Sequence, residues 1–316
     1  MAAPICSFSV DLDPLHCYYD IHGLGAPPEA LRDVILRRGL SRFLALLARR
    51  GIKATFFVVG DDLDPGSRSG TAAGRAILKA AHQAGHELAS HSETHPYEMV
   101  HLPRFRVEAE IDGAHRRLTE LCGAPPVGFR SPGYNLSATV IDALVERGYR
   151  YDSSVLPAPL YYGAKAAVMG AMRLTGKRSL SVLGDPRFLA APLGPYRPAA
   201  GAPWRRGQAP IVELPITVTP GLRIPAIGTY LMAWPGPLRE RLLESVMLRD
   251  FFNFELHGID LIDAAEDGIP PALVAQQQDL RVPLATKQSA LERVLDRLAS
   301  RFRFLRLAEA AEASGV

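Results

Sequence analysis

The sequence predicts an α/β fold in which a parallel sheet curls into a barrel with helices on its outside. Two observations support this prediction. Strand-like and helix-like segments alternate along most of the 316 residues, and side chains suited to catalysis recur at the ends of the strand-like segments. Repeated strand–helix units imply parallel strands joined by crossover helices, and about seven or eight such units fit a barrel. We expect residues 1–316 to form one domain with an insertion at about 155–208.

Short apolar runs mark the predicted strands. They are rich in β-branched and aromatic residues, which favour strands. The clearest run is residues 54–60, which read Ala-Thr-Phe-Phe-Val-Val-Gly. The predicted strands lie at residues 5–10, 54–60, 86–91, 128–132, 149–153, 211–216, 252–257 and 302–307.

Apolar residues at helical spacing mark the segments between the strands. Residues 40–47 carry apolar side chains at positions i, i+3, i+4 and i+7, which is one face of a helix. Residues 71–84 predict a helix that Gly85 ends. Further helices are predicted at residues 107–121, 141–148 and 291–298, and an amphipathic one at 164–174.

The composition is that of an ordinary globular protein. Hydrophobic residues make up 47% and charged residues 22%, which excludes a disordered chain. The net charge of +3 is too small for a nucleic-acid coat, so we expect no nucleic-acid partner. The three cysteines show no CxxC spacing, which predicts neither a disulfide framework nor a cysteine-based zinc site.

Targeting signals are not recognisable in the sequence. The first residues lack a basic segment followed by an apolar run, so we expect no signal peptide. No stretch of about 18 uncharged apolar residues predicts a membrane span. The expected location is therefore the cytoplasm.

The predicted insertion differs in charge from the rest of the chain. Residues 155–208 hold eight basic residues and one acidic residue. Residues 164–174 mix apolar side chains with cations, as an interfacial helix does. Two interpretations remain open: the insertion contacts the inner face of a membrane or a phosphate-bearing carrier, or it is a solvated cover over the barrel mouth.

Seven polar residues fall at the ends of predicted strands, where parallel α/β folds gather their catalytic groups. His91-Ser-Glu-Thr-His95 has two imidazoles that can converge on one ion, although a turn with two partly exposed histidines has the same spacing. Two histidines and an aspartate with open positions make a hydrolytic metal site. The seven residues are Asp11, Asp13, His91, His95, Arg130, Asp152 and His257.

The order Asp-x-Asp, His-Ser-x-x-His, Arg-x-Pro-Gly, Asp-Ser-Ser and Leu-His resembles the polysaccharide deacetylase superfamily (NodB homology, carbohydrate esterase family 4). The resemblance covers residues 6–307 and is strongest to the intracellular branch that includes the aminoarabinose-phosphoundecaprenol deformylase. It implies a distorted (β/α)7 barrel. It also implies that Asp13, His91 and His95 bind a divalent metal, for which zinc is the expected ion and Co²⁺, Ni²⁺ or Fe²⁺ would also suit.

The resemblance implies catalytic roles as well. Asp11 matches the general base, Arg130 the residue that orients it, and His257 the general acid. Asp152 matches the carboxylate that holds the acid histidine. A backbone N–H near Gly133 or Tyr134 would contact the oxyanion. Leu12 separates the two aspartates, so the sequence does not decide which of Asp11 and Asp13 is the base and which is the metal ligand. Asp13 is the expected ligand.

These implications predict a metal-dependent hydrolase that removes an N-acetyl or N-formyl group from a sugar. With a cytoplasmic location, the expected substrate is a sugar on a lipid-phosphate or nucleotide carrier. Two alternatives are a hydrolase of a cyclic ureide, similar to allantoinase, and a carbohydrate-binding pseudoenzyme. Glu213 is a further candidate, since it lies near a strand end and either reaches the cleft or forms a structural pair.

Overall fold

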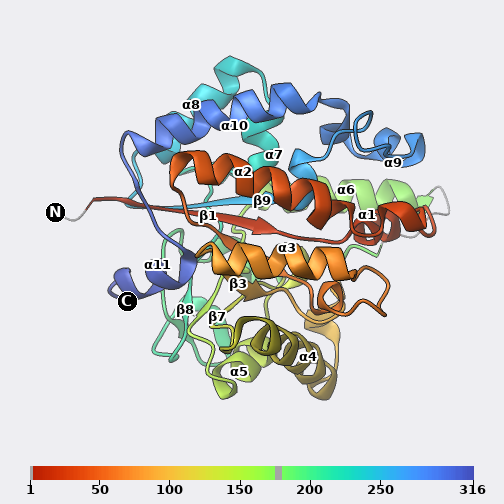
Figure 1. Ribbon diagram of the computed structural model, residues 1–316. Helices are drawn as coiled ribbons and strands as arrows, with labels where there is room; N and C mark the ends of the chain where they lie inside the picture. The colour runs from red at the N-terminus through yellow and green to blue at the C-terminus, as the bar shows by residue number, and fades with distance from the viewer. Residues whose placement is uncertain (1–2, 175–179) are drawn as a thin grey trace.

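The computed structural model describes residues 3–174 and 180–316. Within these residues, one eight-stranded parallel sheet curls into a half-barrel (Figure 1). The strand order is β10-β1-β2-β3-β4-β5-β8, and β9 pairs with the other side of β1. This arrangement confirms the predicted fold class. The strands are β1 (Ile5–Asp11), β2 (Thr55–Val58), β3 (Glu87–Ser90), β4 (Gly128–Phe129), β5 (Tyr151–Asp152), β8 (Val212–Glu213), β9 (Phe251–His257) and β10 (Arg303–Phe304).

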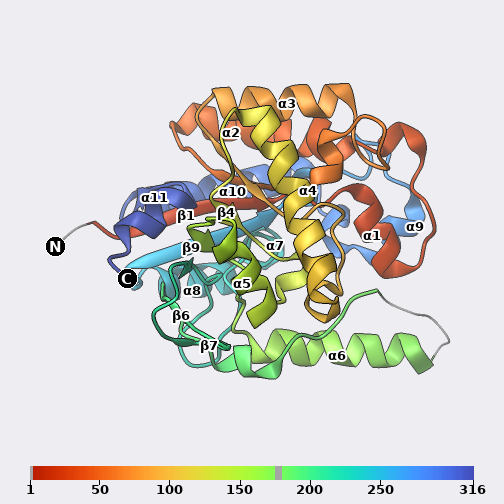
Figure 2. The same ribbon diagram turned by 90° about the horizontal axis from the view of Figure 1, so that it is seen from below.

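Helices cover the outside of the sheet (Figures 1 and 2). Local signals set their ends: Thr71 Oγ1 accepts a hydrogen bond from the Gly74 N–H at the start of α3, and Gly51 ends α2 at a positive φ. The helices are α1 (Leu15–His22), α2 (Ser41–Arg50), α3 (Ala72–Gln83), α4 (Arg104–Cys122), α5 (Ala138–Glu146), α6 (Pro159–Leu174), α7 (Gly228–Ala233), α8 (Gly236–Val246), α9 (Pro271–Gln276), α10 (Leu284–Ala299) and α11 (Leu307–Ala313).

Short 3-10 and π turns connect these elements. One of them, η2, is a π-helix that runs directly into α2. Several others follow strands and carry the chain across the mouth of the half-barrel. They are η1 (Glu29–Leu31), η2 (Ile35–Leu40), η3 (Gly60–Leu63), η4 (Met99–His101), η5 (Pro132–Tyr134), η6 (Pro186–Ala190), η7 (Gly258–Leu261) and η8 (Gln278–Arg281).

Alternation along the strands separates an apolar outer face from a polar interior. On β1, Phe8 faces the helices, and its ring lies 6.0 Å from the ring of Phe43 on α2. The next residue, Ser9, faces the interior, where its hydroxyl donates to Asn253 on β9. Successive side chains of a strand point to opposite faces, so the interior of this half-barrel gathers buried polar groups.

The last predicted strand is wrong in its second half. Residues 302–307 were expected to form a strand, but only Arg303–Phe304 pair with β1. The side chain of Glu309 accepts a hydrogen bond from the Arg306 N–H, which starts α11 at Leu307. An acidic residue three positions after the N-cap is a helix-start signal, and it is present in this sequence.

Residues 155–208 lie between β5 and β8 of the sheet. Their described part contains α6, η6 and an antiparallel pair formed by β6 (Pro198–Ala199) and β7 (Ala202–Arg206). Two of the basic residues, Lys177 and Arg178, lie outside the described residues. Among the described helices, none is long and apolar enough to cross a membrane.

Candidate active site

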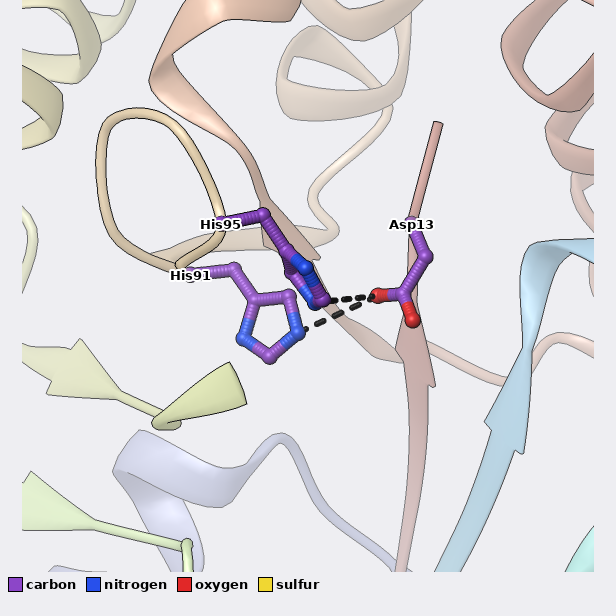
Figure 3. Close-up of side chains that lie close together, drawn as sticks. All are labelled: Asp13, His91 and His95. Atoms are coloured by element: carbon purple, nitrogen blue, oxygen red, sulfur yellow. Dashed lines mark ion pairs between the residues drawn. The ribbon is translucent and has the colours of Figure 1, made fainter. Parts of the chain in front are cut away.

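Three side chains converge where β1 and β3 end (Figure 3). Asp13 Oδ1 lies 3.2 Å from Nε2 of His91 and 3.4 Å from Nε2 of His95. All three residues are buried. The structure therefore brings together the three predicted metal ligands.

Two atoms of this cluster lack hydrogen-bond partners although they are buried: Asp13 Oδ1 and His95 Nε2. Unpaired buried polar atoms are costly unless something binds them. His91 Nδ1 lies 2.7 Å from the carbonyl oxygen of Arg130. Because a carbonyl only accepts, Nδ1 carries the proton and Nε2 keeps its lone pair for a ligand. This donor set fits a divalent ion such as zinc.

The turn after β3 aims the second histidine. Ser92 and His95 both have positive φ values, 65° and 60°, which non-glycine residues rarely adopt. The Ser92 hydroxyl accepts a hydrogen bond of 3.1 Å from the His95 N–H. Uncommon backbone geometry of this kind clusters at functional sites, and here it brings the two imidazole rings to a centroid distance of 4.9 Å.

A buried ion pair lies directly below the cluster. Arg130 Nη1 donates to Asp11 Oδ1 at 2.5 Å, and both side chains are almost completely buried. Arg130 donates hydrogen bonds to the carbonyl and hydroxyl of Ser153, which directly follows β5, and its guanidinium covers the ring of Phe57. The other oxygen, Asp11 Oδ2, lies 4.0 Å from His91 Nε2. Arg130 thus fixes one oxygen of Asp11 and leaves the other near the cluster of Asp13, His91 and His95.

His257, at the end of β9, has two acceptors around its ring. Its Nδ1 lies 3.0 Å from Glu255 Oε1, and its Nε2 lies 3.1 Å from the hydroxyl of Tyr134. The Tyr134 hydroxyl itself donates to Glu255, so it accepts from His257. Both ring nitrogens therefore donate, which is the pattern of a protonated imidazole.

Electrostatics agree with this hydrogen-bond pattern. Burial alone lowers the pKa of His257, but the negative charges of Glu255, Asp13 and Asp11 outweigh it and raise the pKa to about 9. The raised pKa and the two donated hydrogen bonds both favour the protonated form of His257. A protonated imidazole in a cavity is suited to general acid catalysis.

The predicted partner of His257 is wrong. Asp152 does not contact His257; its carboxylate accepts hydrogen bonds from the hydroxyl and N–H of Ser154. The reason is strand alternation: Ser153 faces the interior and holds Arg130 there, so Asp152 points to the opposite face of β5. The carboxylate beside His257 is Glu255.

Asp152 instead pairs with Glu213, its register partner on β8. Burial, followed by the charge of Asp152, raises the pKa of Glu213 well above its usual range. Glu213 also accepts a hydrogen bond from the Val155 N–H. The pair joins β5 to β8 at the edge of the sheet. Of the two roles considered for Glu213, the structure therefore shows the structural pair and not a position in the cleft.

A cavity of about 310 Å³ opens above these groups. Asp11, Asp13, His91 and His257 line it, so the predicted base, two of the three predicted ligands and the predicted acid face one space. Gly133 and Tyr134 also line it, both at positive φ. The cavity wall is completed by aromatic and polar residues, including Tyr161, Lys165, Thr229 and Tyr230.

Glu255 is the residue that sequence analysis missed. The signal was present in the run Phe252-Asn-Phe-Glu-Leu-His257, in which Asn253, Glu255 and His257 alternate with apolar residues. This alternation places Glu255 and His257, two positions apart, on the same face of the strand.

Part of this chain is similar in sequence to known proteins. Residues 33–151 match the polysaccharide deacetylase family. Over 130 residues the chain is 31% identical to the peptidoglycan deacetylase-like protein FGM2 of Gibberella zeae, a match that covers 40% of this chain and 36% of that relative. The matched segment therefore spans about a third of the relative's length.

Solved structures share the fold over nearly the whole chain. A Mycobacterium smegmatis protein, provisionally described as a polysaccharide deacetylase, aligns with a TM-score of 0.60 and 17% identity over 99% of this chain and 93% of that one. The PuuE allantoinase aligns with a TM-score of 0.55 and 17% identity over 98% and 90%. The sequence match to the polysaccharide deacetylase family is confined to residues 33–151, the solved structures show the shared fold, and neither selects a branch of that superfamily.

Proposed function

We propose that this chain, whose residues 33–151 match the polysaccharide deacetylase family, is a metal-dependent hydrolase that removes an N-acetyl or N-formyl group from a sugar. One observation carries the proposal. Asp13 and His91, which form a cluster with His95, line one cavity with a carboxylate held by a buried arginine and with a histidine held by a buried carboxylate. Metal-assisted amide hydrolysis uses a metal, a base and an acid in this relation.

In this proposal, Asp11 accepts the proton of the attacking water, and Arg130 fixes the direction of its carboxylate. A divalent ion held by Asp13, His91 and His95 would polarise the acyl oxygen and make the water more acidic. His257 gives its proton to the leaving amine. The Tyr134 hydroxyl, in contact with His257 Nε2, orients that proton.

The assignment of base and ligand follows from the contacts of the two aspartates. Asp13 Oδ1 is buried, faces both imidazoles and has no hydrogen-bond partner. One carboxylate oxygen of Asp11 accepts a hydrogen bond from Arg130, and the other lies near the cluster. We therefore take Asp13 as the metal ligand and Asp11 as the base, with zinc as the metal, and a backbone N–H at Gly133 or Tyr134 as the oxyanion donor.

The substrate in this proposal is a single sugar on a lipid-phosphate or nucleotide carrier. The cavity volume of about 310 Å³ is at the small end for ligand sites, which suits one head group. Tyr161 and Tyr230 line it and offer aromatic faces to a sugar ring. The described cysteines are all free, which supports the reducing, cytoplasmic location that the proposal includes.

Cyclic ureide hydrolysis is the second candidate, since the fold of this chain aligns with that of the PuuE allantoinase. The pseudoenzyme alternative is weakened by the complete set of metal ligands, base and acid.

The test is an activity screen of zinc-loaded protein. N-acetyl and N-formyl amino sugars, free, nucleotide-linked and lipid-phosphate-linked, are incubated beside allantoin, and products are detected by mass spectrometry. Release of acetate or formate is the expected result. Turnover of allantoin alone, or of no amide, would overturn the proposal.

A further inference from the structure

Helix α6 presents an apolar stripe to the outside of the molecule. We call this set the α6 stripe; its members recur every three or four residues and are all exposed. Leu160 and Val168 are each 60% exposed, and Leu174 is 91% exposed. A Cβ atom added at Gly163 would meet nothing within 4 Å. The α6 stripe comprises Leu160, Gly163, Ala164, Ala167, Val168, Ala171 and Leu174.

This pattern is the reverse of a surface helix that covers a core. Such a helix turns its apolar face inward and its polar face to water. Here the described residues of α6 include none that is fully buried, and Figure 2 shows the helix along the outer edge of the molecule. An exposed apolar face of this kind marks an interaction surface.

The opposite side of α6 belongs to the candidate active site. Tyr161 and Lys165 line the catalytic cavity. The Tyr162 hydroxyl donates to the carbonyl of Tyr134 at 3.0 Å and thereby ties the helix to the cavity wall. Whatever binds the α6 stripe therefore lies one helix away from the reacting groups.

The charge around the stripe identifies the partner. Between residues 155 and 184 the sequence contains four basic residues and no acidic one. Arg173 is exposed on α6 itself. A symmetric dimer built on this helix would bring two segments of net positive charge together, which is unfavourable. Apolar side chains flanked by cations match an anionic lipid surface instead.

We propose that the α6 stripe docks the protein on an anionic lipid bilayer, which places the catalytic cavity one helix away from the bilayer surface. An apolar cavity of about 400 Å³ adjoins the helix and shares Tyr134 with the catalytic cavity. Its walls include Pro159, Leu183, Phe188 and Leu189. This recess suits the apolar end of an amphiphile. The docking therefore favours a lipid-linked sugar substrate over a nucleotide-linked one, and this choice of substrate rests on the proposed function.

The test is vesicle flotation of the full chain. Vesicles of phosphatidylcholine alone are compared with vesicles that also contain phosphatidylglycerol, at low and high salt. We expect the wild-type chain to float with the anionic vesicles and less so at high salt. The double variant Leu160→Glu/Val168→Glu should lose at least about tenfold in binding, because both apolar side chains leave the bilayer.

Leu248→Glu is the matched control. Leu248 is 80% exposed but precedes β9 and so lies at the opposite end of the barrel from the cavity; this variant should bind vesicles like the wild type. The proposal is overturned by wild-type protein that ignores anionic vesicles, by equal loss in both variants, or by a concentration-dependent dimer that the double variant abolishes. Hydrolysis of a water-soluble N-acyl sugar, measured in parallel, reports on the proposed function separately.

Discussion

Glu255 and Asp152 are both buried carboxylates near the mouth of the half-barrel, but only Glu255 contacts a titratable group in the cavity. The difference comes from strand parity alone. Glu255 lies two residues before His257 on β9 and shares its face, whereas Asp152 lies on the outward face of β5. The face of the strand on which each carboxylate lies therefore decides which one raises the pKa of His257.

Replacing Glu255 by glutamine should shift the pH dependence of activity. The carboxylates around His257 raise its pKa, so the protonated acid is present below that pKa, and activity is lost as the pH rises through it. Glu255→Gln removes one negative charge and should move the alkaline limb of kcat/KM down by about one pH unit or more. The measurement is a pH–rate profile.

Asp152→Asn is the matched control for this profile. It changes a buried carboxylate of similar depth that does not touch His257. Its alkaline limb should coincide with that of the wild type, although its stability is lower. An equal shift in both variants would show that overall charge, and not contact with His257, sets the limb.

At the scale of elements, the loop after β3 is the most sensitive part of the site. Its two histidines are placed by residues in left-handed backbone geometry, and the Ser92 hydroxyl supports the turn by accepting from the His95 N–H. Groups that support a ligand in this way commonly change metal affinity when they are removed. The turn, and not only the ligands, should therefore determine binding.

Ser92→Ala should weaken zinc binding by about tenfold, as measured by competition with a chromophoric chelator. Ser137→Ala is a suitable control, because the Ser137 hydroxyl caps α5 by accepting from the Val140 N–H. It should cost about 1 kcal/mol of stability and leave zinc affinity unchanged. Equal zinc affinity in Ser92→Ala and wild type would contradict this role of the turn.

The sequence was informative about elements with strong local signals and less so about partners across the sheet. The apolar run at residues 54–60 and the helical spacing at 40–47 correspond to β2 and α2. The His91–His95 spacing located both imidazoles correctly. The pairing of His257 with Glu255, in contrast, depends on the direction of side chains, which motif order alone does not give. The boundary at Leu307 failed because a helix-start signal was overlooked.

At the scale of the whole molecule, Arg130 holds the half-barrel together from within. It contacts Asp11 and Ser9 on β1, the chain after β5 through Ser153, and the ring of Phe57 on β2. All of these partners are buried. One guanidinium thus joins strands that are far apart in the sequence, and the same contacts orient the proposed base.

Arg130→Met should destabilise the fold by about 3–5 kcal/mol, because it leaves Asp11 as an unpaired buried charge. The double variant Asp11→Asn/Arg130→Met removes that charge and should recover part of the loss. Urea unfolding of the four proteins completes the cycle. Additive losses in the double variant would contradict the importance of the ion pair.

The measurement that tests the central claim most directly combines metal content and turnover in one experiment. Purified protein is stripped with a chelator, reloaded with zinc and assayed on an N-acyl amino sugar, beside Asp11→Asn and His91→Ala. We predict one zinc per wild-type chain and activity that returns on reloading. Asp11→Asn should keep its zinc and lose at least about 10²-fold in kcat, while His91→Ala should lose both. Full activity in the stripped protein or in Asp11→Asn would contradict the account.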